Sequence, residues 1–310
     1  MKKLVGVLFN IALVLTTSYA LGQTAEEFEF SNEWLSKIEK IAPEKGNGSI
    51  EGEKNILIFS LHTGFKHWVI PHTEAVMKML AEKSGRFTVT TSMDITMFEK
   101  KNLKNFDAII LNNNCSIGDK RNLFWDVLKN DSSLDEPQRI KKAKKLEKNL
   151  LKYVKKGHGL MVLHGGIVMQ NKSSNFGDMV GGSFDYHPKQ QKIKVKLVDS
   201  NHKLVQAFDG AGFEHIDEPY FFNKAYFDYN FRPLLYMEAN QLEGKKKEVK
   251  DNIKYISWIK KYGKGRVFYC SPSHNAQSYK NPKLLQFLLD GLHYTVGNIV
   301  CDDSPMGKQQ

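Results

Sequence analysis

The sequence predicts an α/β protein built on a mainly parallel central sheet. Short apolar runs of the kind that form buried parallel strands occur at residues 54–62, 105–113 and 159–164. Helical stretches separate these runs, and the alternation of strand with helix is typical of βαβ units. With 310 residues and no visible internal repeat, the chain is most economically interpreted as one large domain of this class.

The first residues have the pattern of a secretory signal peptide. Two lysines precede the apolar run LVGVLFNIALVL, and small residues follow it up to Gly22. Membrane spans usually need about 18 apolar residues, so an anchor is the less favoured interpretation. We expect residues 1–22 to be removed on export to the periplasm or the medium. No later run has spanning length, so we expect no stable membrane insertion after cleavage.

The elements of the first half follow from their local signals. Residues 23–53 are expected to form a short helix, opened by Ser31, and a glycine-rich linker. A helix is expected over 71–85, because proline suits a first helical turn and glycine a helix end. The remaining expected elements are strands at 86–92, 105–113 and 159–164 and helices at 119–129 and 136–156.

The second half of the chain has a different pattern of expected secondary structure. Beyond residue 190, strand-like runs follow one another with little helix between them, which favours mixed or antiparallel strands added to the sheet. The last helix is expected over 282–297, so the domain is expected to cover 54–297 and to leave a tail at 298–310.

Charge and cysteine content limit the function classes. The net charge is +11, and the basic residues are concentrated at 139–156 and 243–250. The first segment alternates lysine with apolar residues at helical spacing, as a solvated helix face does. Aromatic residues of the kind that stack on single-stranded nucleic acid are not interleaved with this segment, so we expect no nucleic-acid partner. Acidic glycans are still possible partners of such a basic surface. Three scattered cysteines favour buried thiols over a disulfide framework.

Histidines and one acidic residue fall where the strands or loops of such a sheet end. Ligands bind open α/β sheets at the carboxyl ends of the strands. Imidazoles and a carboxylate are ligands that zinc or manganese accepts. The candidates are His62, His67, His164, His187, Glu218 and His274.

Each of these histidines also has a structural explanation, because an imidazole near a strand end often only completes the core. His72, His158, His202, His215 and His293 are assigned to structure or surface. Two glycines follow His164 directly, and neither Ser nor Cys stands at this strand-to-helix turn. Acyl transfer by a nucleophile at this turn is therefore not expected.

Several segments resemble the ThuA-like (trehalose utilisation) family. SLHTGFKHWVIPH is similar to its Thr-Gly-Phe-Arg-His segment, and GLMVLHGG to its Gly-Phe-x-Gly-Ile-His-x-Ala segment. MVGGSFDYHP, IDEPYFF and KKYGKGRVFYCSPSHNAQSY resemble three further family segments, in the same order along 54–297. The chain departs from the family pattern at Lys66, at Ser273 and in a segment at 119–145 that looks like an insertion.

The resemblance implies a flavodoxin-like three-layer sandwich, similar to class I glutamine amidotransferases that have lost their catalytic cysteine. His164 would take the place of that cysteine. The implied catalytic residues are His164, His274 and His67, and the implied metal ligands are His164, His187, Glu218 and His274. We expect these groups to meet in one pocket, with His67 at its rim.

The family's link to disaccharides and 3-keto sugars implies a small carbohydrate as the partner and a divalent metal, zinc or manganese, as the cofactor. The reaction class is left undecided among a lyase, a hydrolase and an isomerase. The competing interpretation is a sugar-binding accessory protein without turnover, with Trp68, Tyr186, Tyr220 and Phe221 stacking on the sugar. A homo-oligomer is compatible with either interpretation.

Overall fold

The computed structural model describes residues 24–48, 52–247, 249 and 251–307. The expected leader at 1–22 lies outside these residues. Among the described helices, none combines the length and the apolar character that crossing a membrane requires.

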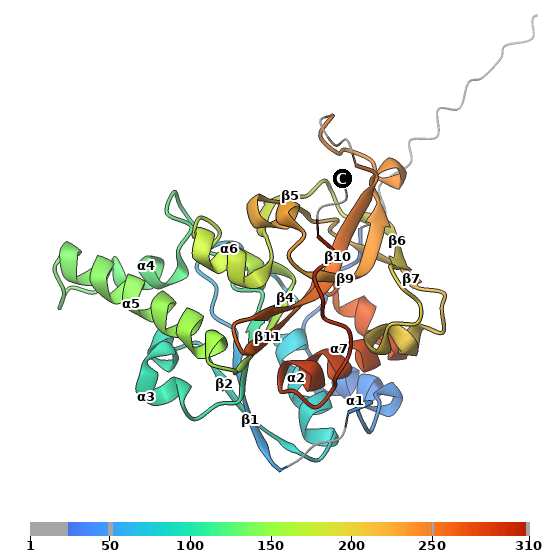
Figure 1. Ribbon diagram of the computed structural model, residues 1–310, viewed down its shortest axis with the longest axis horizontal. Coiled ribbons are helices and arrows are strands. Elements are labelled where there is room, and N and C mark those ends of the chain that lie inside the picture. Colours follow the sequence, from blue (N-terminus) through green and yellow to red (C-terminus); the bar gives the residue numbers. More distant parts are fainter. Residues whose placement is uncertain (1–23, 49–51, 248, 250, 308–310) are drawn as a thin grey trace, which may run out of the picture.

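A nine-stranded sheet forms the middle layer, and its first five strands are parallel (Figure 1). Their spatial order is β2 (Phe87–Ser92), β1 (Lys54–Phe59), β3 (Ala108–Asn112), β4 (Gly159–Leu163) and β11 (Gly265–Cys270). The side chains of β3 and β4 are buried throughout, which explains their continuous apolar sequence. The predicted α/β class with a parallel central sheet is confirmed.

The other four strands extend the sheet in antiparallel fashion from β11. They are β10 (Ile253–Tyr262), β9 (Arg232–Glu238), β6 (Gln191–Leu197) and β7 (Phe213–Asp217). A separate two-stranded sheet pairs β5 (Ser183–Tyr186) with β8 (Phe221–Asn223). The mixed second half therefore matches the prediction.

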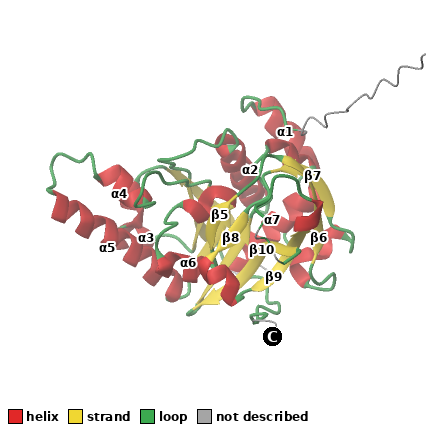
Figure 2. Cartoon of the chain, turned by 90° about the horizontal axis from the view of Figure 1, so that it is seen from above, coloured by secondary structure: helices red, strands yellow, loops and turns green. Residues whose placement is uncertain are grey.

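Helices cover both faces of the sheet and complete the three layers (Figure 2). One face carries α1 (Asn32–Ile41), α2 (Ile70–Lys83) and α7 (Pro282–Thr295). The other carries α3 (Lys100–Leu103), α4 (Leu123–Leu128), α5 (Glu136–Lys155) and α6 (Ser174–Val180). Buried apolar residues form one core cluster on each face, so the middle sheet is covered on both sides.

Local signals placed most helix ends within a few residues. Ser31 caps α1 by accepting a hydrogen bond from the Trp34 amide at 3.2 Å. Asp135 and Gln138 form a reciprocal capping box at the start of α5. The helix expected over 119–129 begins later, at Leu123, because the Asn122 side chain caps it there.

Candidate functional site

His164 stands at the end of a central strand, in a strained turn. β4 ends at Leu163, and His164 opens a short 3₁₀ helix, His164–Val168, with a φ of 41°. Non-glycine residues rarely adopt this left-handed conformation, which is concentrated at functional turns. The following Gly165 fits because a Cβ there would lie 2.8 Å from Cε1 of His67 and 2.9 Å from Sγ of Cys115. The turn therefore brings His164 against a loop that follows β1.

Three imidazole rings converge at this edge of the sheet. The ring centroids of His67, His164 and His274 are 5.0 to 5.1 Å apart, and their planes are inclined to one another by 65° to 88°. Glu218 completes the group, and one potential ligand atom from each of the four residues lies within 4.8 Å of the others. Oxygen atoms of Glu218 lie 3.4 Å from Nε2 of His164 and 3.4 Å from Nε2 of His274. We call these four residues the His₃Glu cluster.

The outer nitrogens of two rings are held in place. Nδ1 of His164 lies 2.8 Å from the Ser271 carbonyl oxygen, and a carbonyl only accepts, so this nitrogen carries the proton. Nδ1 of His274 lies 3.0 Å from Oδ1 of Asn275. The Asn275 amide donates to the Ile216 carbonyl, which fixes its oxygen toward His274. The His164 imidazole therefore turns its Nε2 lone pair inward, as metal-binding histidines do. The amides of Asn275 and Gln190 hold the His274 ring with its Nε2 also facing Glu218.

The inward nitrogens have no other partner. Nε2 of His164 and Nε2 of His274 are buried and make no hydrogen bond in the described structure, and their contacts with Glu218 lack hydrogen-bond geometry. Unpaired buried acceptors are costly and are rare in proteins. Two such nitrogens facing one carboxylate fit a divalent cation between them, so the donor set suits zinc or manganese.

Burial sets the charge state of the cluster. It lowers the pKa of His67 well below its ordinary value, and the neighbouring imidazoles add to the effect. Burial also lowers the pKa of His274 to about 4. For Glu218, burial raises the pKa, but the neighbouring imidazoles of His164, His274 and His187 outweigh it and leave the pKa below normal. Neutral imidazoles beside an ionised carboxylate are the forms that bind metal.

Asp217 and His215 form a layer behind the cluster that sequence reasoning missed. The Asp217 carboxylate accepts from the Ser273 and Glu218 amides at 3.1 and 2.9 Å. Its oxygens also lie 3.4 Å from Nδ1 of His215 and 4.0 Å from Nδ1 of His274. Burial raises the pKa of Asp217 to about 7. The position of Asp217 directly before Glu218 in the chain is the signal that points to it, whereas the sequence predicts only a structural or surface role for His215.

His187 and His67 occupy places different from those expected. Nε2 of His187 lies 3.7 Å from Glu218, and its side chain is 36 % exposed, so His187 stands at the mouth rather than within the His₃Glu cluster. His67 is only 1 % exposed and is inside the cluster rather than at the rim. The reason is that the loop after β1 turns inward before α2, where Ile70 donates to the His67 carbonyl.

The four aromatic residues expected to bind sugar separate in space. Tyr220 is buried, and its ring lies 4.0 Å from that of His164. Trp68 is partly buried and packs on Phe28 and His72, against the core beside α1 and α2. The structure therefore brings only one of the four to the His₃Glu cluster.

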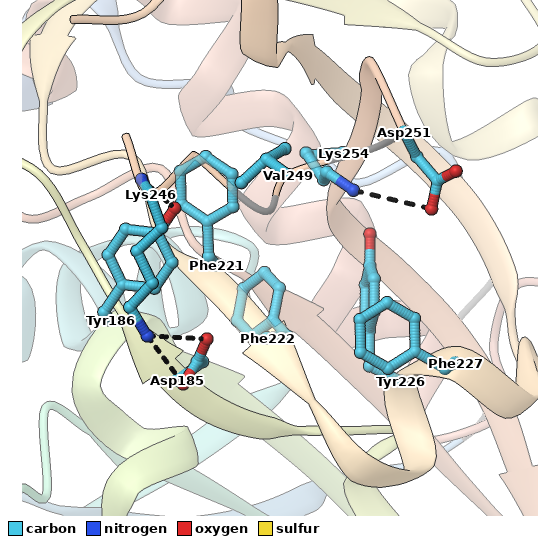
Figure 3. Close-up of a pocket in the computed structure, with 10 residues that line it drawn as sticks. All are labelled: Asp185, Tyr186, Phe221, Phe222, Tyr226, Phe227, Lys246, Val249, Asp251 and Lys254. Atoms are coloured by element: carbon cyan, nitrogen blue, oxygen red, sulfur yellow. Dashed lines mark hydrogen bonds and ion pairs between the residues drawn. The ribbon is translucent and has the colours of Figure 1, made fainter. Parts of the chain in front are cut away.

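Tyr186 and Phe221 line another pocket (Figure 3). Their rings stack at 4.7 Å, and Nζ of Lys246 lies 4.2 Å above the Tyr186 ring. Both faces of Tyr186 are thus covered. The strand register explains the separation, because β5 and β8 shift register between Phe184 and Tyr186.

Phe65 is an aromatic residue at the site that sequence reasoning did not single out. Its side chain is 64 % exposed, and its ring lies 4.8 Å from that of His67. Single exposed apolar side chains are common on protein surfaces, but this ring lies directly beside the His₃Glu cluster, where it is accessible to a bound molecule. Its position in the family-like segment before His67 was the available signal. By contrast, the cavity that adjoins Glu218 on the inner side measures only about 10 Å³.

Comparisons with known proteins agree with this architecture. A family profile described as ThuA, trehalose utilisation, matches residues 55–295. Among curated proteins, none matches the chain. A ThuA-like protein of Bacteroides uniformis superposes with a TM-score of 0.59 at 15% identity, covering 81% of this chain and 94% of that one. A ThuA-like protein of Parabacteroides merdae gives 0.56 at 16% identity, covering 82% and 95%. A cytoplasmic protein of Salmonella typhimurium gives 0.51 at 13% identity, covering 78% and 98%.

Proposed function

The chain belongs to the ThuA family of trehalose utilisation, and from this premise we propose that it is an exported enzyme of carbohydrate metabolism. Its substrate would be a disaccharide or an oxidised, 3-keto sugar. The reaction would use a divalent metal ion held by His67, His164, Glu218 and His274. The observation that carries the proposal is the convergence of three imidazoles and one carboxylate, with two buried nitrogens left unpaired.

The chain's own groups suit proton transfer next to a carbonyl. A divalent ion, when bound, polarises a sugar carbonyl and so acidifies the neighbouring C–H group. His187 is the partly exposed imidazole at the mouth, and the Pro188 carbonyl 2.9 Å from its Nδ1 leaves Nε2 free to accept that proton. Return of that proton to the former carbonyl carbon, with transfer of the hydroxyl proton to the carbonyl oxygen, gives isomerisation. Cleavage of the bond to the glycosidic oxygen, which leaves as an alcohol after taking the proton from His187, gives elimination.

Aromatic rings would orient the sugar at the mouth. Phe65 offers an exposed face beside His67, against which the apolar face of a pyranose can pack. Tyr220 supports His164 from within, because its ring is buried against that imidazole. Phe65 would therefore contact substrate, and Tyr220 would be a positioning residue.

A second candidate function is sugar binding without turnover. The exposure of the Phe65 ring favours it, because an aromatic face at the surface can hold the apolar face of a sugar by itself. A sugar that only rests on Phe65 and His187 at the surface would need no access to the buried cluster.

Removal of the metal separates the two functions. The purified protein is incubated with trehalose, other disaccharides and their 3-keto forms, before and after treatment with a chelator, and products are separated by chromatography. The enzyme interpretation expects product formation that stops with chelator and returns with zinc or manganese. Sugar binding that survives chelation, with no product from any sugar, would support the accessory role instead.

Export is a separate part of the proposal and rests on the leader pattern of residues 1–22. Amino-terminal sequencing of the protein from its native cells tests it. A mature chain that begins near Gln23 is expected, and a chain that retains Met1 in the cytoplasm contradicts it.

A further inference from the structure

The basic segment singled out in the sequence forms a ridge between two hollows. It folds as α5, which reaches away from the sheet beside α3 and α4 (Figure 1). A hollow of about 610 Å³ lies between α3 and the carboxyl-terminal half of α5, and one of about 680 Å³ lies on the side of α6. The first is lined by Lys100, Lys104, Lys152, Lys155 and Lys156. The second is lined by Lys120, Arg121, Lys144, Lys148 and Lys172.

The lysines of the first hollow are not neutralised by the protein. All five are exposed, and none has a carboxylate within ion-pair distance among the residues that the structure describes. The second hollow contains one acidic residue, Glu147, and its carboxylate already accepts a hydrogen bond from Ser173. Both hollows therefore present positive charge to solvent.

The arrangement of charge along α5 works against its own stability. Lys144, Lys148, Lys152 and Lys156 follow one another at four-residue intervals, so each faces the next on the helix surface. Like charges at this spacing destabilise a helix. A negatively charged partner along the ridge would convert this repulsion into attraction.

The surface is separate from the His₃Glu cluster. The first hollow includes His158, which directly precedes β4, whereas His164 directly follows it. The five residues of β4 lie between them, so the hollow stands at the opposite edge of the parallel sheet. Occupation of one site does not require occupation of the other.

The chemistry of the ridge distinguishes among polyanions. Of the described aromatic rings that lie near it, Tyr153 is buried and stacks on His158 at 4.2 Å, and Lys120 covers one face of Trp125 at 3.4 Å. Single-stranded nucleic acid is normally held by free aromatic faces. Helices that bind membrane interfaces carry exposed large apolar residues, and among the described residues α5 has none. A hydrophilic chain with regularly spaced negative charges fits best.

We propose that α5 and the two hollows beside it bind an acidic polysaccharide, with its carboxylate or sulfate groups seated among the lysines. This goes beyond the proposed sugar chemistry, because it would hold the protein on an anionic glycan at a site remote from the reacting groups. The proposal does not depend on a metal or on turnover.

Binding to polygalacturonate tests the proposal. The full chain is titrated with polygalacturonate and with neutral dextran at several salt concentrations, in the presence of chelator so that the metal site plays no part. We expect binding to polygalacturonate that weakens steeply with salt, and none to dextran. Failure to bind polygalacturonate at low salt would overturn the proposal.

Two charge-matched variants locate the surface. Changing Lys100, Lys104, Lys152 and Lys156 to Gln should weaken binding by about tenfold or more and should change the melting temperature little, because the repulsion that it removes is offset by the lost attraction between Lys152 and the carboxyl end of α5. Changing the exposed Lys40, Lys45, Lys194 and Lys280 to Gln alters the total charge equally and should change binding by less than about twofold. Equal losses of binding affinity in the two variants would show a general effect of net charge and would refute the location of the site at α5. Tighter binding to single-stranded DNA or to phosphatidylglycerol vesicles would refute the polysaccharide.

Discussion

Gly165 offers a sharp test of how the turn and the His₃Glu cluster depend on each other. Substitution of Gly165 by Ala places a methyl group 2.8 Å from Cε1 of His67 and 2.9 Å from Sγ of Cys115. Ordinary contacts begin near 3.4 Å, so the His67 ring would have to move by about 0.6 Å. Cys115 is itself buried and lies 3.9 Å from Nδ1 of His67, so it leaves little room for that movement.

The expected effect on stability and on metal binding follows from this displacement. Overpacking a buried site by one methyl group typically costs about 1–3 kcal/mol of unfolding free energy. Ligand distances in metal sites are kept to about 0.2 Å, and disturbing the groups that hold a ligand typically lowers metal affinity about 10- to 100-fold. We therefore expect Gly165→Ala to bind zinc at least about tenfold more weakly.

Urea unfolding and zinc titration measure the two effects, with Gly291→Ala as the matched control. A Cβ at Gly291, in α7, would meet Cε2 of Phe268 at 2.7 Å, so this variant is also overpacked but remote from the cluster. Both variants should lose stability, and only Gly165→Ala should lose metal affinity. Wild-type zinc affinity in Gly165→Ala would refute the placement of His67 among the ligands. Equal losses of zinc affinity in Gly165→Ala and Gly291→Ala would show that destabilisation anywhere in the fold is enough to weaken zinc binding.

Three further predictions address the mouth, the proton carrier and the pH dependence of stability. Phe65→Ala should raise KM for the sugar by about tenfold through the loss of a stacking face, with metal content unchanged; an unchanged KM would exclude the contact. His187→Gln should retain the metal and lose most of kcat, whereas loss of the metal would make His187 a ligand. Burial lowers the pKa of His293 to about 4, below its unfolded value near 6.5. The neutral imidazole therefore contributes at most about 3 kcal/mol to the free energy of unfolding above pH 6.5, and this contribution is lost as the pH falls toward 4. Urea unfolding of His293→Leu should depend less on pH between 7 and 5 than that of wild type, and an identical slope would contradict this reasoning.

The parallel half of the fold was predictable because burial leaves a local trace in the sequence. β3 and β4 are covered on both faces, so they appear as unbroken apolar runs. The cap of α1 was equally local, since Ser31 acts within three residues. The order in which β9, β6 and β7 join β10 was not predictable, because antiparallel pairing depends on contacts between distant residues.

The position of the candidate site was predictable where a side chain follows a strand closely, as His164 does directly after β4 and His274 does four residues after the end of β11. The placement of Tyr186 was not, because an irregular register between β5 and β8 decides which way that ring turns. Trp68 stands one residue after His67, yet it packs on Phe28 from the amino-terminal segment. A contact between residues forty positions apart in the sequence leaves no local pattern. The sequence does not reveal the place of Asp217 behind the cluster, because its partner Ser273 is distant in the sequence and follows β11. Its other partner, His215, lies two positions earlier on β7.

The metal content of the protein tests the central claim most directly. The full chain is purified without chelator, dialysed against zinc or manganese, and analysed by elemental mass spectrometry beside His164→Ala. The convergence of His67, His164, Glu218 and His274 predicts one ion per chain in the wild type and less than a tenth of an ion in the variant, with both proteins folded. A wild-type chain without bound metal after reconstitution, or a His164→Ala chain that holds one full equivalent, would contradict a common metal centre.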